Sequence, residues 1–363
     1  MRIALAYNAK PGVRTEIARL RPEFLVPEDE DEPPDRGGVG TDEDAYAEWD
    51  TSETILAVAD ALAQRAEVRL VEARDGFPER VRRAAPDLVF NMAEGLHGPS
   101  REAQVPAVLE LLRIPYTGSD PLTLAVCLDK AWTKAVLAHA GVATAPFAVL
   151  EGPDEVSRAG EVGFPAIVKP AWEGSSKGIR DDQVVRTPAE LAARVGRVWD
   201  TYRQPVVVEK FLTGREFTVA ILGNGADLRV LPPVEIRFDD LPAGANPVYS
   251  WEAKWVWDRP EAPLDLFECP ARLSPAEAAE IEDLCRRTAR ALRLRDWARI
   301  DLRMDERGRL HVLEVNPLPG VLPRPEDNSC YPKAARAAGF DYPSMIWAVA
   351  EAACRRLGLE PPR

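Results

Sequence analysis

Two strand-like segments near the C-terminal end constrain the fold of this chain more than any other feature. Arg299–Met304 and Leu310–Asn316 are rich in apolar side chains, and a polar stretch containing Gly308 separates them. This pattern is typical of a β-hairpin. An even-length loop centred between Arg307 and Gly308 fixes the pairing of the two strands, whereas an odd-length loop would break it.

In this register two carboxylates face each other across the hairpin. Asp301 lies opposite Glu314, and Arg299 lies opposite Asn316. Like charges directly opposite one another destabilise a sheet, so a cation between them would explain the pair. Carboxylate and amide oxygens are ligands that suit Mg²⁺ shared with substrate phosphates. The alternative is a solvated sheet face with interspersed arginines.

Side-chain alternation along the second strand favours the metal interpretation. Strict alternation predicts one shared face for four residues of this strand: Leu310, Val312, Glu314 and Asn316. Glu314 and Asn316 then interrupt an otherwise apolar strand, which is better explained by a bound ion than by a solvated face.

Composition excludes several classes of protein. The chain has 363 residues, enough for roughly two to three domains. Its formal net charge of −13 argues against a nucleic-acid partner, although a local lysine cluster could still bind a nucleotide. No apolar run is long enough to span a membrane. The 3 histidines and 5 cysteines are scattered, which argues against zinc and serine hydrolases and predicts free thiols in the cytoplasm.

The N-terminal part has the pattern of a doubly wound α/β domain. We expect strands at Arg2–Tyr7, Val68–Val71 and Asp87–Asn91, and a helix capped by Thr51 or Ser52. Alternating strands and helices of this kind form a parallel sheet.

A polar insert, roughly residues 8–50, interrupts this domain after its first strand. Its centre, Glu28–Asp35, consists of six acids and two prolines and cannot bury itself. We expect a solvated surface loop. The alternative is a lid, because loops that follow the strands of open α/β sheets lie near ligands.

The rest of the chain alternates further helices and strands. One helix is expected over Pro121–Ala140, and another begins after Ser274, which forms a capping box with Glu277. The expected strands are Phe164–Pro170, Pro205–Glu209 and Glu216–Leu222.

Three features are weak signals by themselves. Lys130 and Lys169 could each be a surface lysine or a phosphate ligand. The loop Glu173–Gly178 offers backbone N–H groups and hydroxyls to an anion, but it lacks the P-loop pattern. Glu209 could accept a hydrogen bond from an adenine amino group or lie in solvent at a strand end.

Taken together, the motifs resemble those of one family in their order along the chain. They are Asn91 to Gly98, Leu109 to Ser119, Leu128 to Lys130, Ile167 to Pro170 with Glu173 to Ser176, Glu209-Lys210 with Glu216 to Ala220, Glu252 to Lys254, Arg299 to Asp301, and Leu313 to Asn316. They resemble the D-alanine–D-alanine ligase family of ATP-grasp enzymes, from about Pro86 to the C-terminus.

The resemblance implies an α/β (α+β) chain with the ATP-grasp fold, in which two α+β domains sandwich ATP behind an N-terminal doubly wound domain. The expected boundaries are residues 1–118 for the N-terminal domain with its acidic insert, 119–208 for the central domain, and 209–363 for the C-terminal domain, which carries the magnesium and catalytic residues.

The resemblance also assigns roles to residues of this sequence. ATP would be bound by Lys130, Lys169, Ser176, Glu209, Lys210, Leu212, Glu216 and Lys254. Asp301, Glu314 and Asn316 would hold two Mg²⁺ ions, with Mn²⁺ as an alternative. Arg299 and the Gly320 N–H would stabilise an oxyanion, Lys254 would reach the γ-phosphate, and Ser175 would place the substrates. His97 would lie near the first substrate.

The implied reaction is an ATP-dependent carboxylate–amine ligation that joins two amino acids. A carboxylate attacks the γ-phosphate, and an amine then displaces phosphate from the resulting acyl phosphate. The protein would contribute charge neutralisation and positioning. The family also implies a cytoplasmic homodimer that acts on small molecules, without a nucleic-acid or membrane partner.

Three departures from the family concern the amino-acid substrates. The N-terminal glycine-rich loop, whose glutamate binds the first amino group, is absent; Glu48 and Asp50 are candidate replacements, or acids that simply favour a helix N-terminus. Trp255 replaces the usual tyrosine after Glu-Ala-Lys. The segment after Asn316 is longer than usual, and Ser329 in it is a candidate for binding the second substrate's carboxylate.

These departures leave the substrates open. The chain could be a D-Ala–D-Ala ligase, a specialised dipeptide or amino-acid-derivative ligase, or an ATP-binding protein without ligase turnover. A carboxylate–thiol ligase would share the acyl-phosphate step and differ only in its product. The complete set of expected phosphate and metal residues favours an active ligase.

Overall fold

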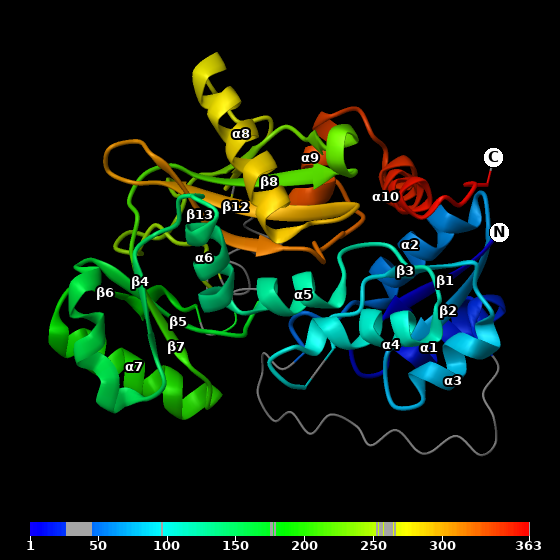
Figure 1. The fold of residues 1–363 in the computed structure, drawn as a ribbon, viewed down its shortest axis with the longest axis horizontal. Coiled ribbons are helices and arrows are strands. Elements are labelled where there is room, and N and C mark those ends of the chain that lie inside the picture. Colours follow the sequence, from blue (N-terminus) through cyan, green and yellow to red (C-terminus); the bar gives the residue numbers. More distant parts are fainter. Residues whose placement is uncertain are drawn as a thin grey trace.

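The computed structural model describes residues 1–26, 46–95, 97–174, 177, 179–251, 253, 257, 264 and 266–362. The acidic centre of the expected insert lies outside them, as do four candidate site residues: Ser175, Ser176, Lys254 and Trp255. The strands form three sheets, which Figure 1 shows with the N-terminal sheet in blue. None of the helices in these ranges is both long and apolar enough to cross a membrane.

The first sheet is parallel and has the order β2-β1-β3. Its strands are β1 (Arg2–Tyr7), β2 (Glu67–Glu72) and β3 (Leu88–Asn91), and its helices are α1 (Val13–Leu20), α2 (Ser52–Ala63), α3 (Phe77–Ala84) and α4 (Gln104–Leu112). Alternate residues of β1 pack on opposite sides: Leu5 joins the core that includes α2, and Ala6 joins the core that includes α3 and α4. Burial on both faces explains why β1 is almost wholly apolar.

The expected loop at residues 8–50 is wrong at its N-terminal end. The helix α1 begins at Val13, and a short 3₁₀ helix covers Pro22–Phe24. Val13 and Ile17 lie one helical turn apart and are buried in the first core. Two buried side chains are enough to dock a helix whose other side chains are half-buried or exposed.

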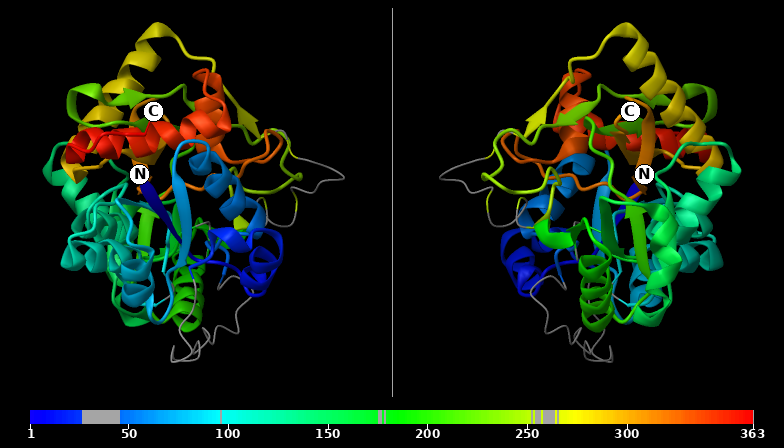
Figure 2. Two further views of the ribbon diagram at one scale, coloured as in Figure 1. Left: turned by 90° about the vertical axis from the view of Figure 1, so that its right-hand side faces the viewer. Right: turned by 90° about the vertical axis from the view of Figure 1, so that its left-hand side faces the viewer.

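The second sheet is antiparallel and has the order β4-β7-β5-β6. Its strands are β4 (Phe147–Leu150), β5 (Ala166–Pro170), β6 (Val184–Val185) and β7 (Val206–Lys210). The helix α7 (Pro188–Tyr202) and the 3₁₀ segment Pro153–Val162 cover one face, with Leu191, Val195 and Val198 in the core. Figure 2 shows α7, in green, toward the opposite end of the molecule from the yellow helix α8.

The third sheet is built around the central strand β8, with the order β11-β10-β8-β12-β13 and with β9 also paired to β8. Its strands are β8 (Glu216–Leu222), β9 (Arg229–Val230), β10 (Val234–Ile236), β11 (Phe267–Glu268), β12 (Trp297–Met304) and β13 (Leu310–Asn316). The expected capping box of Ser274 and Glu277 starts α8 (Pro275–Leu292), which packs on one face together with α6. The other face carries α9 (Cys330–Ala337) and α10 (Tyr342–Leu357).

The helix α10 joins the third sheet to the N-terminal part of the molecule. It packs along α2, as Figure 1 shows in red against blue. The Trp347 indole is buried there and donates a hydrogen bond to the carbonyl of Ala61 at 2.8 Å. One hydrophobic core therefore runs from β1 through α2 and α10 to the third sheet.

The single helix expected over Pro121–Ala140 is wrong, because the structure has two helices. They are α5 (Pro121–Leu128) and α6 (Lys130–His139), and Asp129 between them has extended backbone angles. One oxygen of the Asp129 side chain accepts hydrogen bonds from the backbone N–H groups of Ala131 and Trp132. Asp129 therefore ends one helix and caps the next.

The hairpin confirms that the two carboxylates lie opposite each other, although the loop that joins the strands differs from the expected one. Asp301 pairs with Glu314 and Arg299 with Asn316, but the register shifts beyond Asp301 so that Leu302 pairs with Val312. The loop is therefore not the expected even-length loop. A β-bulge at Leu313 restores the register before the carboxylates.

The bulge also corrects the expected face of β13. Leu310 and Val312 are buried in the core beside α8, together with Val315. Glu314 and Asn316 are on the opposite side and line a cavity. The extra residue in the bulge reverses the alternation, so the four residues do not share one face.

Candidate active site

A cavity of about 280 Å³ lies where the three sheets meet. The second sheet contributes β5 and β7, and the third contributes β8, β10, β12 and β13. The cavity is also lined by β11, by the segments after β3 and before α2, and by the loop after β13. Among the candidate residues, the cavity is lined by Glu48, Lys169, Glu209, Lys210, Leu212, Glu216, Arg299, Asp301, Glu314, Asn316, Gly320 and Ser329.

A buried carboxylate between two lysines forms one wall. Glu209 of β7 is 1% exposed and pairs with Lys169 of β5 and with Lys134 of α6, the latter at 2.6 Å. Burial alone would raise the pKa of Glu209, but Lys134 and Lys169 hold it down at about 2. Glu209 is thus a fixed anion that positions two cations. Its role toward adenine stays a prediction.

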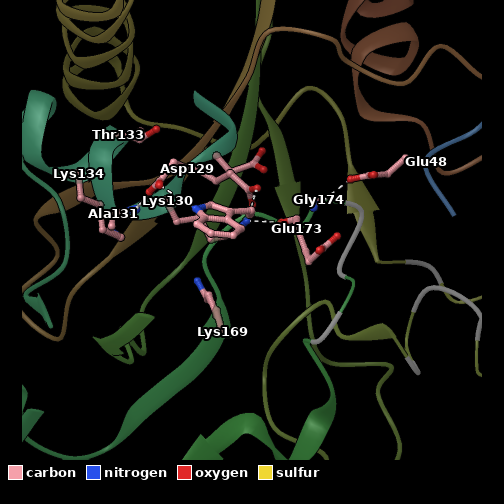
Figure 3. A network of polar contacts seen from close by, with 12 residues as sticks. Glu48, Asp129, Lys130, Ala131, Thr133, Lys134, Lys169, Glu173 and Gly174 are labelled. Carbon is pink, nitrogen blue, oxygen red and sulfur yellow. Dashed lines mark hydrogen bonds and ion pairs between the residues drawn. The ribbon is translucent and has the colours of Figure 1, made fainter. Parts of the chain in front are cut away.

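Lys134 lies behind this wall, buried against Glu209, and was not identified from the sequence. It lies four residues after Lys130 on α6, so the two side chains come from neighbouring turns, as Figure 3 shows. Lys134 also donates to the Thr144 hydroxyl at 2.9 Å and lies 5.8 Å from the centre of the Phe147 ring. The spacing from Lys130 was the signal that could have identified it.

The two opposed carboxylates of the hairpin are each paired with a cation. The guanidinium of Arg299 donates to both oxygens of Asp301, at 3.1 and 2.9 Å, and the Thr218 hydroxyl adds a bond of 2.5 Å. Lys130 lies 3.1 Å from the Oε1 atom of Glu314. Burial would raise the pKa of Glu314, but Lys130 and Arg299 bring it below its ordinary value.

These residues fit a hard divalent cation such as Mg²⁺. Asp301 and Glu314 are paired across the strands, and both line the cavity together with Asn316. Their donor atoms are carboxylate and amide oxygens, which Mg²⁺ accepts together with waters and substrate phosphates. Within the described ranges no group of three or more His, Cys, Asp or Glu side chains could hold a metal alone. A metal held by Asp301, Glu314 and Asn316 would complete its ligand set with waters or substrate oxygens.

We call the part of the cavity at Glu216, Lys210 and Leu212 its far end and the part at Glu48 its near end. The far end is formed by β7, β8 and the segment between them. Glu216 accepts a hydrogen bond from Arg303 at 2.7 Å, and burial raises the pKa of its carboxyl. Lys210 donates to the carbonyl of Phe164, and Leu212 is buried beside it in the wall. This end combines a buried acid, a lysine and apolar side chains.

The near end is organised by Glu48, which connects three segments. Its carboxylate accepts bonds from Arg101 at 2.8 Å and from the backbone N–H of Gly174 at 2.9 Å, the latter drawn in Figure 3. Lys177 lies 3.6 Å away. Although burial would raise the pKa of Glu48, Arg101 and Lys177 hold it below its ordinary value. Glu48 is therefore already engaged by the protein.

The remaining candidates lie in different places. The Ser329 hydroxyl donates to the carbonyl of Gly320 at 3.0 Å, so both are at the cavity. His97 is exposed and is not part of the cavity wall. Two acids not singled out from the sequence, Glu94 and Glu102, lie at or beside the near end.

Comparison with known proteins identifies the family. The family model described as D-ala D-ala ligase C-terminus matches residues 136–351. A D-alanine–D-alanine ligase of Bordetella petrii is 37% identical over 74% of this chain and 77% of its own length. The chain belongs to the D-alanine–D-alanine ligase family. This family consists of ATP-dependent, ADP-forming ligases.

Two further relatives and one solved structure are also similar to this chain. A D-alanine–D-alanine ligase of Pseudomonas putida strain GB-1 is 35% identical over 81% of this chain and 85% of its own. An uncharacterized protein y4sG of Sinorhizobium fredii is 38% identical over 74% and 75%. The crystal structure of a Bacillus anthracis D-alanine–D-alanine ligase complexed with ATP covers 98% of both chains, at 21% identity and a TM-score of 0.68. This match confirms the ATP-grasp fold.

Proposed function

We propose that this protein is an ATP-dependent ligase that joins the carboxylate of one amino acid to the amine of another through an acyl phosphate, releasing ADP and phosphate. One observation carries the proposal. One cavity is lined by Lys169, by two opposed carboxylates suited to a divalent cation and by Arg299, suited to an oxyanion, and Lys130 is ion-paired with one of these carboxylates.

The ion pairs of the cavity are consistent with this use. Without ligand, Lys130 neutralises Glu314, Arg299 neutralises Asp301, and Lys169 pairs with Glu209. Removal of one member of a buried pair is costly, because the other charge is left without a partner. Magnesium and triphosphate arriving together would exchange these partners. The carboxylates would face the metal and the lysines the phosphates.

The nucleotide would lie along the cavity from its far end. Lys130 and Lys169 would contact phosphate oxygens, Glu216 would accept bonds from the ribose hydroxyls, and Lys210 and Leu212 would flank the base. Ser176 and Lys254 complete this proposal from outside the described residues. The bound nucleotide of the Bacillus anthracis ligase supports it.

Asp301, Glu314 and Asn316 would hold the magnesium. A bound ion would neutralise the phosphate oxygens and lower the cost of charge developing on the transferred group. The bulge at Leu313 places Glu314 and Asn316 in the cavity and not in the core.

The chemistry follows in two steps. A carboxylate oxygen attacks the γ-phosphorus, the bond to the bridging oxygen breaks, and ADP leaves. The amine of the second amino acid then attacks the acyl carbon and loses a proton, the bond from this carbon to the phosphate oxygen breaks, and phosphate leaves with the proton as the amide forms. Arg299 and the backbone N–H of Gly320 would bind the oxyanion between these events. Ser175 and Ser329 would help to place the substrates.

The identity of the two amino acids is a separate part of the proposal. D-alanine is the first substrate to test, because the named relatives are D-alanine–D-alanine ligases. A specialised pair of amino acids is the second candidate, because Glu48, expected to replace the missing loop glutamate, is bound to Arg101 and Gly174.

The test uses purified protein with ATP, Mg²⁺ and a library of D- and L-amino acids, and it follows ADP and phosphate together with dipeptide mass. We expect phosphate release to depend on an amino acid and to equal the dipeptide formed. Nucleotide binding without any release, for every pair in the library, would contradict the proposal.

A further inference from the structure

A second, smaller cavity adjoins the first at its near end. Both cavities share four wall residues, and the smaller one adds Glu102: the shared residues are Glu48, Glu94, Glu314 and Asn316. The small cavity has room for about 20 Å³, close to what one water-sized group requires. A group of that size entering from the main cavity would pass the candidate metal ligands.

Glu94 and Glu102 both line this cavity and interact electrostatically with each other. Arg101 acts on both carboxyls and Lys130 on Glu102, but neither cation lies within ion-pair distance of them among the described residues. Glu102 is only 7% exposed. Burial and Glu48 raise the pKa of Glu102 to about 8, and burial together with Glu102 raises the pKa of Glu94 well above its ordinary value. A buried carboxylate normally has a partner.

The cations around the pair are already engaged by other acids. Arg101 lies 2.8 Å from Glu48, Lys177 lies 3.0 Å from Glu173, and Lys130 lies 3.1 Å from Glu314. The described part of this region therefore has two carboxylates beyond those that its lysines and arginine neutralise. A positively charged ligand would supply the missing partner.

The chemistry of the pair favours an ammonium group over a metal ion. Two carboxylates give an ammonium its hydrogen-bond acceptors, and the described residues provide no cluster of three acids, histidines or cysteines for a metal. The position favours an α-amino group. In an α-amino acid the nitrogen is two bonds from the carboxylate carbon, so the carboxylate could lie at Glu314 and Asn316 while the nitrogen enters the small cavity.

We propose that Glu94 and Glu102 bind the α-ammonium group of the amino acid whose carboxylate is phosphorylated. The inference rests on the proposed function and deepens it. The pair takes the place expected of Glu48, whose carboxylate is bound by the protein. It makes the enzyme specific for free α-amino acids. Hydroxy acids with the same side chain, and N-acylated amino acids, are therefore poor substrates for phosphorylation of the carboxylate.

The experiment compares the wild type with E94Q and E102Q, which keep the shape and remove the charge. E79Q is the matched control, because Glu79 is an acid near the start of α3, more than half exposed, and not part of either cavity. The probe is alanine, or the fastest amino acid of the library, set against the hydroxy acid with the same side chain. KM is measured for the probe and for ATP, and thermal unfolding is followed in parallel.

We expect E94Q and E102Q to raise KM for the amino acid by about tenfold or more and to leave KM for ATP nearly unchanged. The ratio of kcat/KM for the amino acid to kcat/KM for the hydroxy acid should fall. E102Q should also unfold at a higher temperature, since it removes a buried carboxyl that ionises readily only in the unfolded chain. E79Q should match the wild type in every measurement.

An unchanged KM for the amino acid in both variants would overturn the inference, as would equal use of the hydroxy acid by the wild type. A lower unfolding temperature of E102Q with unaltered kinetics would show a structural role instead. Failure of the wild type to release phosphate with any amino acid would contradict the proposed function itself, so the two failures are distinguishable.

Discussion

Charged residues in the cavity meet two demands at once. Each charge must be neutralised by a partner so that it can stay buried in the folded protein. Each side chain must also be able to leave that partner when substrate binds. Glu314 meets both demands through Lys130, and Asp301 through Arg299. The exchange of partners costs little when both new partners arrive together. Nucleotide and magnesium should therefore bind cooperatively.

Glu314→Gln should abolish phosphate release while largely sparing the fold. Glutamine has the same shape but lacks the charge that a divalent cation requires. Phosphate release and thermal unfolding measure the two effects. Glu306→Gln, in the exposed turn of the same hairpin, is the control and should behave as wild type. Unchanged turnover of Glu314→Gln would refute the metal assignment.

Lys134→Met should raise KM for ATP about tenfold while changing KM for the amino acids little. Without Lys134, Glu209 would have Lys169 as its one remaining ion-pair partner among the described residues and would hold it away from phosphate. Stability should fall by about 3 kcal/mol, since a buried pair is broken. Initial rates at varied ATP, with urea unfolding, test this. An ATP KM equal to that of the wild type would rule out a positioning role for Lys134.

At the scale of single residues, the sequence predicted the metal-ligand candidates better than it predicted the buried partners of charged side chains. The oxygen donors of β12 and β13 were identified because acids interrupt apolar strands. Lys134, Glu94 and Glu102 were missed, because a lysine on a helix or an acid near a turn is ordinarily solvated. The packing of α6 on the third sheet shows that Lys134 is buried. Glu94 and Glu102 are found only because the fold brings them together with β13 around the small cavity.

Among the elements, helix caps position the phosphate end of the site. Asp129 ends α5, caps α6 and accepts a hydrogen bond from the Trp172 indole at 2.8 Å. It thereby places Lys130 at the first position of α6. The cap thus fixes where α6 begins and, with it, the position of Lys130.

Asp129→Ala should lower the free energy of unfolding by about 1–2 kcal/mol and also raise KM for ATP. Asp120→Ala is its matched control, because Asp120 caps α5 through Thr123 and lies outside the cavity wall. It should cost similar stability and leave KM for ATP unchanged. Urea unfolding and initial rates separate the two effects. Equal kinetics in both variants would show that the Asp129 cap is structural only.

Elements with strong local signals were predicted well, and those decided by tertiary contacts were not. The alternating strand Glu216–Leu222 and the capping box of α8 were found at the expected residues. The break at Asp129 was missed because the apolar pattern continues on both sides of it. The bulge at Leu313 was missed because no local sequence signal marks it. It joins the register set by the turn to the register of Asp301 and Glu314.

For the whole molecule, one buried acid connects the parts. Asp296 is fully buried and binds the Gly118 N–H at 2.8 Å, the Asn224 amide at 2.8 Å and Arg356 at 2.7 Å. These partners belong to the end of the N-terminal part, the turn after β8, and α10. The pairing helps to fix the cavity wall between the three sheets.

Arg356→Met should therefore destabilise the protein by about 3–5 kcal/mol, because Asp296 would lose its ion-pair partner while fully buried. Arg355→Met, at its exposed neighbour, should change stability by less than about 0.5 kcal/mol. Chemical denaturation measures both. Equal effects of the two substitutions would refute the connecting role of Asp296.

Isotope transfer tests the central claim most directly. An amino acid labelled with ¹⁸O in its carboxylate is supplied with ATP, Mg²⁺ and the second amino acid, and the released phosphate is examined by mass spectrometry. Attack of the carboxylate on the γ-phosphorus predicts one ¹⁸O in each phosphate and one in each amide. Unlabelled phosphate accompanying ADP would contradict an acyl phosphate and, with it, the ligase account.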